Sequence, residues 1–102
     1  MRRGTTPTLT FNVDADLIGW DCWVTLNNNG TLTTFEDNRL TKTLVDGRTV
    51  IEVTLTQAET LAMSVGNAEA QIRAYNNGAA VATDISTFGI GRILMDGVIP
   101  NV

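Results

Sequence analysis

The sequence predicts an all-β protein, an antiparallel β-sandwich of the immunoglobulin-like or jelly-roll-like kind, with about seven or eight strands and one short helix near residues 57–65. The first observation behind this prediction is composition: the chain has 16 Thr, 2 Ser and a single Lys, which favours β-branched strand positions over helix surfaces. The second is pattern, since short segments alternate apolar and polar residues between turn signals spaced about eight to twelve residues apart. The length of 102 residues fits a single domain over residues 1–102, in which we expect residues 1–6 to form a flexible arm.

The N-terminal third is predicted to supply one strand and a hairpin. Residues 8–13 alternate apolar with polar side chains and follow Pro7, which can precede a strand without removing a ladder hydrogen bond. Residues 20–26 and 31–35 are predicted to be two strands joined by Asn27–Gly30, because Asn and Gly tolerate the positive φ of a tight turn. The face of residues 20–26 that we expect to be buried carries Trp20, Cys22, Val24 and Leu26.

The middle of the chain combines a loop, a strand and the helix. Residues 36–43 are polar and weakly patterned, which predicts a loop with a short edge strand. Asp46-Gly47 then turns the chain into residues 48–55, the clearest alternation in the sequence. Thr56–Glu59 has the Thr-x-x-Glu form of a capping box, so a helix is expected to begin there and to stop at Gly66.

The C-terminal third is predicted to contain a second hairpin and a final strand. Residues 68–75 and 79–84 form the hairpin, closed by Asn76–Gly78. Residues 87–95 are apolar on both faces, which indicates a central strand or one covered by a neighbour. Turn-forming residues are expected to end this strand. They are Asp96, Gly97 and Pro100.

Charge and composition argue against several classes of function. With no His, one Cys and a formal net charge of -4, the chain lacks the usual residues for hydrolysis, tetrahedral zinc or phosphate binding. We therefore expect no enzymatic activity, no cofactor and no nucleic-acid partner. Its apolar runs are shorter than the roughly 18 residues of a bilayer span, and no secretory signal follows Met1–Arg3, so no membrane partner is expected. Cys22 has no internal disulfide partner, which suits a reducing compartment.

Three short motifs could carry chemistry but have simpler interpretations. Asp14-Ala15-Asp16 with Asp21 could begin a calcium loop, yet Thr25 stands where the loop needs its last carboxylate. Asn29-Gly30-Thr31 matches the glycosylation pattern, but without a secretory signal it is simply a turn. Gly89-Ile90-Gly91 lacks the third glycine of a dinucleotide loop, so these glycines indicate a bulge or a close backbone approach.

The candidate functional residues are aromatic and basic side chains on the polar faces of predicted strands. Trp23, Arg73 and Tyr75 belong to the residue types that carry most interface energy, so they are candidate protein contacts. The alternative, that the facing sheet or the helix covers Trp23 and Tyr75, stays open at this point. Cys22 lies on the apolar face of its strand, which predicts a buried structural thiol rather than a nucleophile.

Several stretches of the sequence carry a family resemblance. They are Gly4–Phe11, Leu55–Leu61, Val81–Ile85 and Gly91–Leu94. Together they resemble a group of proteins of about a hundred residues encoded by tailed phages and prophages of Gram-positive bacteria. The positions of Asp16–Gly19 and Asp46-Gly47, each before a strand, are also similar to the N-terminal modules of phage baseplate upper proteins. The chain departs from those proteins in ending at Val102, without the long extension that carries a receptor-binding or fibre region.

This resemblance implies a non-enzymatic virion protein of the tail, the baseplate or the head. Such a protein acts through contacts with other virion proteins and through self-association. It would be found in the host cytoplasm during synthesis and then in the virion. The alternative is a free cytoplasmic binding module, either a phage-encoded inhibitor of a host protein or a carbohydrate-binding domain that uses Trp23 and Tyr75.

Overall fold

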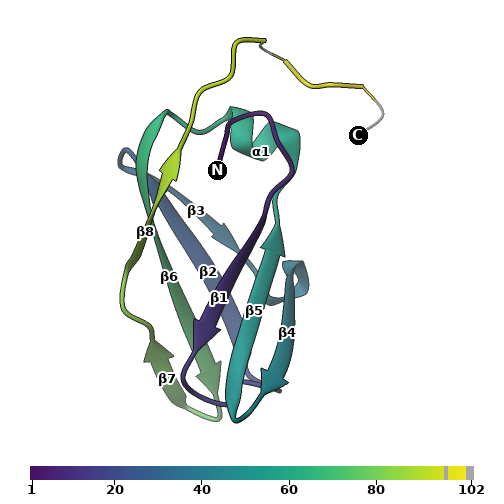
Figure 1. Cartoon of the computed structure of the whole chain (residues 1–102). Coiled ribbons are helices and arrows are strands. Elements are labelled where there is room, and N and C mark those ends of the chain that lie inside the picture. Colours follow the sequence, from purple (N-terminus) through teal and green to yellow (C-terminus); the bar gives the residue numbers. More distant parts are fainter. Residues whose placement is uncertain (96, 101–102) are drawn as a thin grey trace.

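Two antiparallel β-sheets pack face to face in the computed structural model, which describes residues 1–95 and 97–100 (Figure 1). The smaller sheet has the strand order β1-β5-β4, formed by β1 (Thr8–Val13), β5 (Arg48–Thr54) and β4 (Leu40–Val45). Strand β5 is the central strand of this sheet and pairs with β1 on one side and β4 on the other. Strand β1 therefore lies at one edge of the sandwich.

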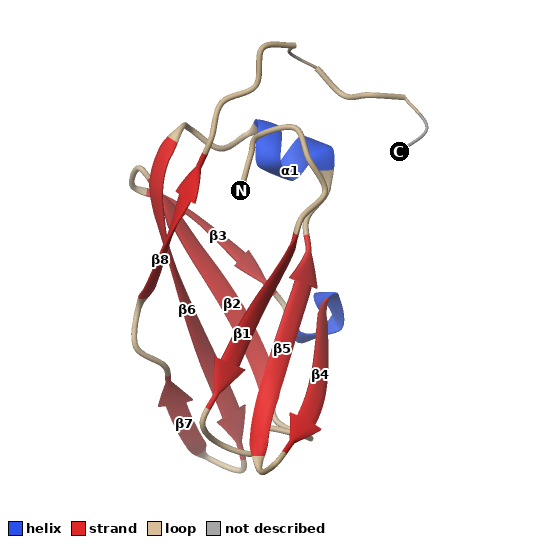
Figure 2. Cartoon of the chain, in the orientation of Figure 1, coloured by secondary structure: helices blue, strands red, loops and turns tan. Residues whose placement is uncertain are grey.

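The larger sheet contains the remaining strands. Its order is β3 (Thr31–Phe35), β2 (Asp21–Asn28), β6 (Gly66–Asn76) and β7 (Ala79–Ala82). Strand β8 (Ser86–Ile90) pairs with the first half of β6, so β7 and β8 share one side of that long strand (Figure 2). The prediction of an all-β antiparallel sandwich with one short helix is confirmed.

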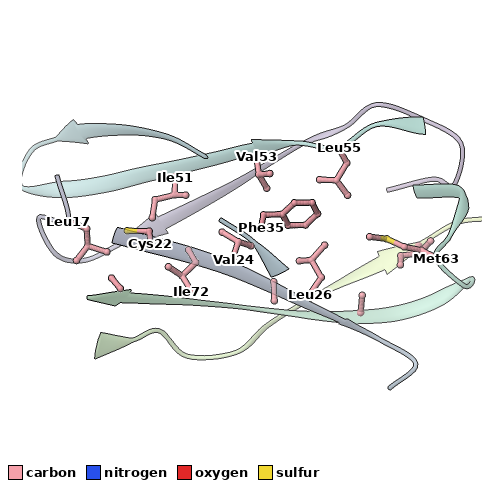
Figure 3. Close-up of a cluster of buried hydrophobic side chains, with 14 residues drawn as sticks. Leu17, Cys22, Val24, Leu26, Phe35, Ile51, Val53, Leu55, Met63 and Ile72 are labelled. Carbon is pink, nitrogen blue, oxygen red and sulfur yellow. The ribbon is translucent and has the colours of Figure 1, made fainter. Parts of the chain in front are cut away.

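The core fills the space between the sheets, where the predicted alternation places it (Figure 3). On β2, Cys22, Val24 and Leu26 are at most 1% exposed, and on β5 the same holds for Ile51 and Val53. Strand β6 contributes mostly alanines to this face, which let the two sheets approach closely. Burial of this apolar surface provides the main driving force for folding.

Three tight turns fix the register of the hairpins β2–β3, β4–β5 and β6–β7. Both central residues of each turn have positive φ: 52° and 86° at Asn29-Gly30, 50° and 77° at Asp46-Gly47, and 47° and 83° at Asn77-Gly78. This geometry matches the right-handed twist of paired strands, and Asn, Asp and Gly adopt it at low cost. The predicted turn positions are confirmed.

The prediction of a loop with a short edge strand over residues 36–43 is confirmed for the edge strand, which is longer than expected and extends to Val45. The chain forms a 3₁₀ turn, η1 (Asp37–Arg39), and then the full strand β4. Lys42 interrupts the apolar–polar alternation that would have identified all of β4 in the sequence, because it lies on the inward side of this strand, where an apolar residue is expected. Its ammonium donates to Asp37 Oδ1 at 2.7 Å and to the Trp20 carbonyl at 2.5 Å, so this position is satisfied by an ion pair.

The helix α1 (Gln57–Leu61) begins as predicted. The Glu59 amide donates to Thr56 Oγ1 at 3.2 Å, and the Thr56 amide donates to Glu59 Oε1 at 2.8 Å. This reciprocal pair is the predicted capping box, and it satisfies two amides that the helix leaves without partners.

The helix ends earlier than the predicted limit near residue 65. The side-chain amide of Asn28, which is 8% exposed, pairs with the backbone of Ser64: the Ser64 amide donates to Asn28 Oδ1 at 2.7 Å and the Ser64 carbonyl accepts from Nδ2 at 3.1 Å. These bonds hold the chain in a non-helical path after Leu61. Gly66, predicted to stop the helix, is the first residue of β6 and has φ 133°.

An ion pair on the helix yields a pH prediction. Arg39 donates to Glu59 at 3.0 and 2.8 Å, and these hydrogen bonds hold the pKa of the Glu59 carboxyl below its usual value. A lowered folded pKa means that the stabilisation is present above the usual glutamate pKa and is lost as the pH falls through the folded value. Glu59→Gln keeps an acceptor for the Thr56 amide but removes the charge.

We expect Glu59→Gln to lower the free energy of unfolding by about 0.5 kcal/mol at neutral pH, since the pair is partly exposed. The difference between the two proteins should vanish at acidic pH. Urea unfolding over a pH series measures it. A difference that stays constant into the acidic range would show that the ion pair is not its source.

The final strand is shorter than predicted and lies at an edge. Strand β8 stops at Ile90, which pairs with Gly66, because β6 offers no earlier residue to pair with. The chain then leaves the sheet, and Leu94 is 89% exposed. The prediction of a strand over residues 87–95 that is central or covered by a neighbour is therefore correct for the presence of a strand and wrong for its end and its position. The expectation for Asp96 lies outside the described residues.

The N-terminal residues do not project as the arm that we expected over residues 1–6. Arg2 forms a parallel bridge with Gly91, and the Arg3 amide donates to the Gly91 carbonyl at 3.0 Å. The Thr5 amide donates to Thr60 Oγ1 at 3.1 Å, and that hydroxyl donates to the Thr5 carbonyl at 2.9 Å. The segment is thus bound along the end of β8 and against α1.

Candidate functional site

The predicted contact residues meet on the outer face of the larger sheet. Trp23 on β2 lies directly opposite Arg73 on β6, and Tyr75 lies opposite Asp21. Trp23 and Tyr75 are therefore diagonal neighbours on one face, a separation that long aromatic side chains can bridge. We call Trp23, Arg73 and Tyr75 the outer-face cluster.

The outer-face cluster points away from the core. Its strands bury the opposite side chains against the smaller sheet, and α1 lies at one end of the sandwich (Figure 1). Tyr75 is 47% exposed, Arg73 is exposed, and Trp23 is half-buried among its neighbours. The next strand, β7, places only Ala80 and Ala82 beside Tyr75 and Arg73. Small neighbours leave the aromatic and guanidinium groups accessible from that side.

The rest of this face is a ladder of polar side chains. Thr25 and Thr34 share a hydroxyl hydrogen bond of 3.0 Å, and Asn27 Nδ2 donates to Glu69 Oε1 at 2.9 Å. Side chains already paired with each other offer less to a partner than unpaired ones do. The outer-face cluster is therefore the part of this sheet best suited to recognition.

Two of the three acidic residues of the possible calcium motif have other partners. Asp14 Oδ1 lies 3.2 Å from Arg48 Nε, and Asp16 Oδ1 accepts from the Ile18 amide at 3.0 Å. Over residues 1–95 and 97–100, no group of three or more His, Cys, Asp or Glu side chains is arranged to hold a metal ion.

Cys22 lies inside the sandwich as a free thiol and is fully buried. Burial raises the pKa of the thiol, and Asp37 and Asp21 add to this effect while Lys42 opposes it. The thiol therefore stays protonated at neutral pH, and a protonated thiol is a poor nucleophile. The predicted burial of Cys22 is confirmed.

A groove, which the sequence did not predict, opens between the edge strand β1 and the strands β7 and β8. Its volume is about 800 Å³. Most apolar side chains at its floor are only partly covered, Ile72 being the buried exception, and carboxylates lie along its rim. The apolar lining residues include Leu9, Phe11, Val13, Trp20, Ile72 and Phe88, and the carboxylates are Asp14, Asp16 and Asp84. No sequence signal marks this groove, because its two walls belong to different sheets.

The opposite side of the sandwich is closed. There the chain passes from β3 to β4 through η1, and the Asp37 carboxylate of this turn accepts hydrogen bonds from both sheets. Its Oδ1 accepts from the Cys22 amide of the larger sheet at 3.0 Å and from Lys42 Nζ of the smaller sheet at 2.7 Å. The groove is consequently an asymmetric feature of the fold.

The fold and these surfaces define a small antiparallel β-sandwich with an open side. A scan of the chain against protein-family models gives no match, and a search among curated proteins finds no significant similarity. In the part of the chain that the structure describes, no helix has the length and apolar character needed to cross a membrane.

Proposed function

We propose that the chain is a non-enzymatic structural and assembly protein of a phage particle, a component of the tail, the baseplate or the head. It acts through contacts with other virion proteins and with copies of itself. It accumulates in the host cytoplasm during synthesis and then joins the virion. The phage setting of this proposal rests on the resemblance of the four sequence stretches, and the mode of action rests on the surface.

The observation that supports a contact function is the outer-face cluster. Trp, Arg and Tyr are enriched at the energetic centres of protein interfaces, and here they lie on adjacent, rigid strands. Residues held on a sheet lose little conformational freedom when a partner binds. The cluster combines one cation with two aromatic rings, so it suits a partner surface with carboxylates and apolar side chains.

Mass spectrometry of purified particles tests this proposal. A virion component is expected in many copies per particle, at a stoichiometry that stays constant through density-gradient purification. Its absence from particles would overturn the proposal and favour a free binding module that acts in the host cytoplasm.

A variant of Trp23 tests the contact surface. We expect Trp23→Ala to change the thermal midpoint by less than about 4 °C, since the side chain lies outside the core. Incorporation of the variant into particles, when it is supplied during infection, should fall by roughly tenfold or more. Thr25→Ala on the same face of β2 is the matched control and should be incorporated normally. A large loss of thermal stability in Trp23→Ala would instead make Trp23 a packing residue.

The diagonal placement of Trp23 and Tyr75 also favours a second candidate, a carbohydrate-binding domain. Two neighbouring aromatic rings on one face can stack against the apolar faces of sugars. Binding to a glycan array that is lost in both Trp23→Ala and Tyr75→Ala, together with absence from particles, would favour this candidate.

A further inference from the structure

The free edge of β1 carries unused backbone hydrogen-bonding groups beside the groove. The Leu55 amide donates to the Pro7 carbonyl at 2.9 Å. Bonded residues alternate along an antiparallel ladder, so Leu9, Phe11 and Val13 bond to β5 and the residues between them face outward. The 2.8 Å contact between the hydroxyls of Thr8 and Thr54 agrees with this assignment, because pairs without backbone bonds lie closer together.

Thr10 and Asn12 therefore direct their amides and carbonyls away from β5, on the side where both residues line the groove. Within the described ranges, the backbone bonds outside the ladders include none from these residues. An exposed edge of this kind is a template for pairing with another extended chain.

The chain itself contains a segment that suits this edge. Residues 92–95, Arg-Ile-Leu-Met, are separated from β8 by Gly91 alone and lie outside both sheets. Leu94 is 89% exposed and Met95 is 63% exposed, which is unfavourable for side chains of this size. Neighbouring side chains of a strand point to opposite faces, so in a strand added to β1 Leu94 can enter the partly apolar groove while Met95 stays on the outer face. Arg92, the segment's cation, is exposed. The groove rim carries Asp14, Asp16 and Asp84 without any Lys or Arg among its lining residues, and because Asp14 is ion-paired with Arg48, Asp16 and Asp84 are the carboxylates that complement Arg92.

Hydrogen bonds on both sides of residues 92–95 prevent this segment from reaching the groove of its own copy. Before it, the Gly91 amide donates to the Met1 carbonyl at 2.6 Å. After it, Ile99 exchanges two hydrogen bonds with the side chain of Gln57, at 2.7 and 3.0 Å. These bonds hold both ends at the α1 end of the sandwich, away from the part of the groove at the end of β1, which Asp14 and Asp16 follow in the chain (Figure 1). A second copy must supply the strand.

We propose that residues 92–95 of one copy add as a strand to the free edge of β1 in a second copy and cover its groove. The contact joins different surfaces of the two copies, so it leaves a free segment at one end and an open groove at the other. Repetition then builds a chain or closes a ring. The inference rests on the proposed assembly function for its biological setting, but it is tested with the purified chain alone.

Sedimentation velocity over a concentration series up to roughly millimolar tests the contact. The wild-type chain should pass from monomer to larger species as the concentration rises. Leu94→Asp places a carboxylate against an acidic groove and should weaken association by roughly tenfold or more. Leu32→Asp, at a position 67% exposed on β3, is the matched control and should associate like the wild type. A wild-type chain that stays monomeric, or equal effects of both variants, would overturn the inference and leave the groove to a segment of another protein.

The acceptor side is tested with Thr10→Pro. This change removes an amide that β5 does not use, so the monomer should keep its fold while strand addition is blocked. Disulfide trapping provides a measurement that does not depend on this variant. A mixture of Thr10→Cys and Met95→Cys should form mixed dimers in clear excess over a mixture of Thr43→Cys and Met95→Cys, because Thr10 and Met95 share the outward face of the added strand pair whereas Thr43 lies on the far edge strand β4. No excess would contradict the contact whatever the particles contain.

Discussion

Leu26→Ala is expected to lower the free energy of unfolding by about 2–5 kcal/mol, the largest effect that we predict for a single substitution. The side chain is 1% exposed and lies between the sheets, so its removal leaves a cavity that a sandwich of paired strands cannot easily fill (Figure 3). In a domain of this size the thermal midpoint should fall by roughly 10 °C or more. Urea unfolding and differential scanning calorimetry measure the two quantities.

Leu32→Ala is the control for this prediction. It removes the same atoms from the neighbouring strand β3, but Leu32 is 67% exposed. Its effect should stay within about 0.5 kcal/mol. Similar losses in both variants would mean that strand propensity, and not burial between the sheets, determines the loss in the free energy of unfolding.

The second large effect is expected for Thr49→Val. Thr49 is 0% exposed, and its hydroxyl accepts from the Leu17 amide at 2.8 Å and donates to the Ala15 carbonyl at 2.7 Å. Valine keeps the volume and the branched shape but leaves both backbone groups without this partner. We expect a loss of about 1–3 kcal/mol in the free energy of unfolding and faster hydrogen exchange at the Leu17 amide.

Thr34→Val is the matched control, since it removes a hydroxyl that bonds to Thr25 on the outer face, 3.0 Å away. Water can replace that bond, so the expected change is within about 0.5 kcal/mol. A Thr49→Val protein as stable as the wild type would show that the connection between β1 and β2 does not depend on this hydroxyl.

The sequence predicted those parts of the fold that depend on neighbouring residues. Alternation in β5 and β2 is local, and it gave the buried faces of both strands. The Asn-Gly and Asp-Gly turns are local as well, because positive φ is a property of the residues themselves. The capping box at Thr56 belongs to the same class, since its two bonds join residues three positions apart.

The errors arose where distant residues decide the structure. Lys42 occupies an inward position of β4 only because Asp37 and the Trp20 carbonyl satisfy its charge. The length of α1 is limited by Asn28 from another strand, and the end of β8 by the length of β6. A pattern in residues 87–95 cannot show that the partner strand has already ended.

The candidate site, like the fold, could be predicted from the sequence only where it depends on neighbouring residues. Alternation placed Trp23, Arg73 and Tyr75 on the outward sides of their strands, but only the register of β2 and β6 brings them onto one face as neighbours. The groove could not be predicted, since it requires knowing which strand edges remain unpaired and which side of the sandwich is closed by Asp37.

The three tight turns also bear on the order of events during folding. A hairpin with a short turn closes within about 1–10 μs, because few residues must be ordered before its strands meet. Three hairpins of this protein can therefore form early and independently. Strand β1 must pair with β5 although β2, β3 and β4 lie between them in the sequence, and β2 must pair with β6 although β3, β4, β5 and α1 lie between them. These distant pairings carry most of the loop-closure entropy, so they should set the folding rate.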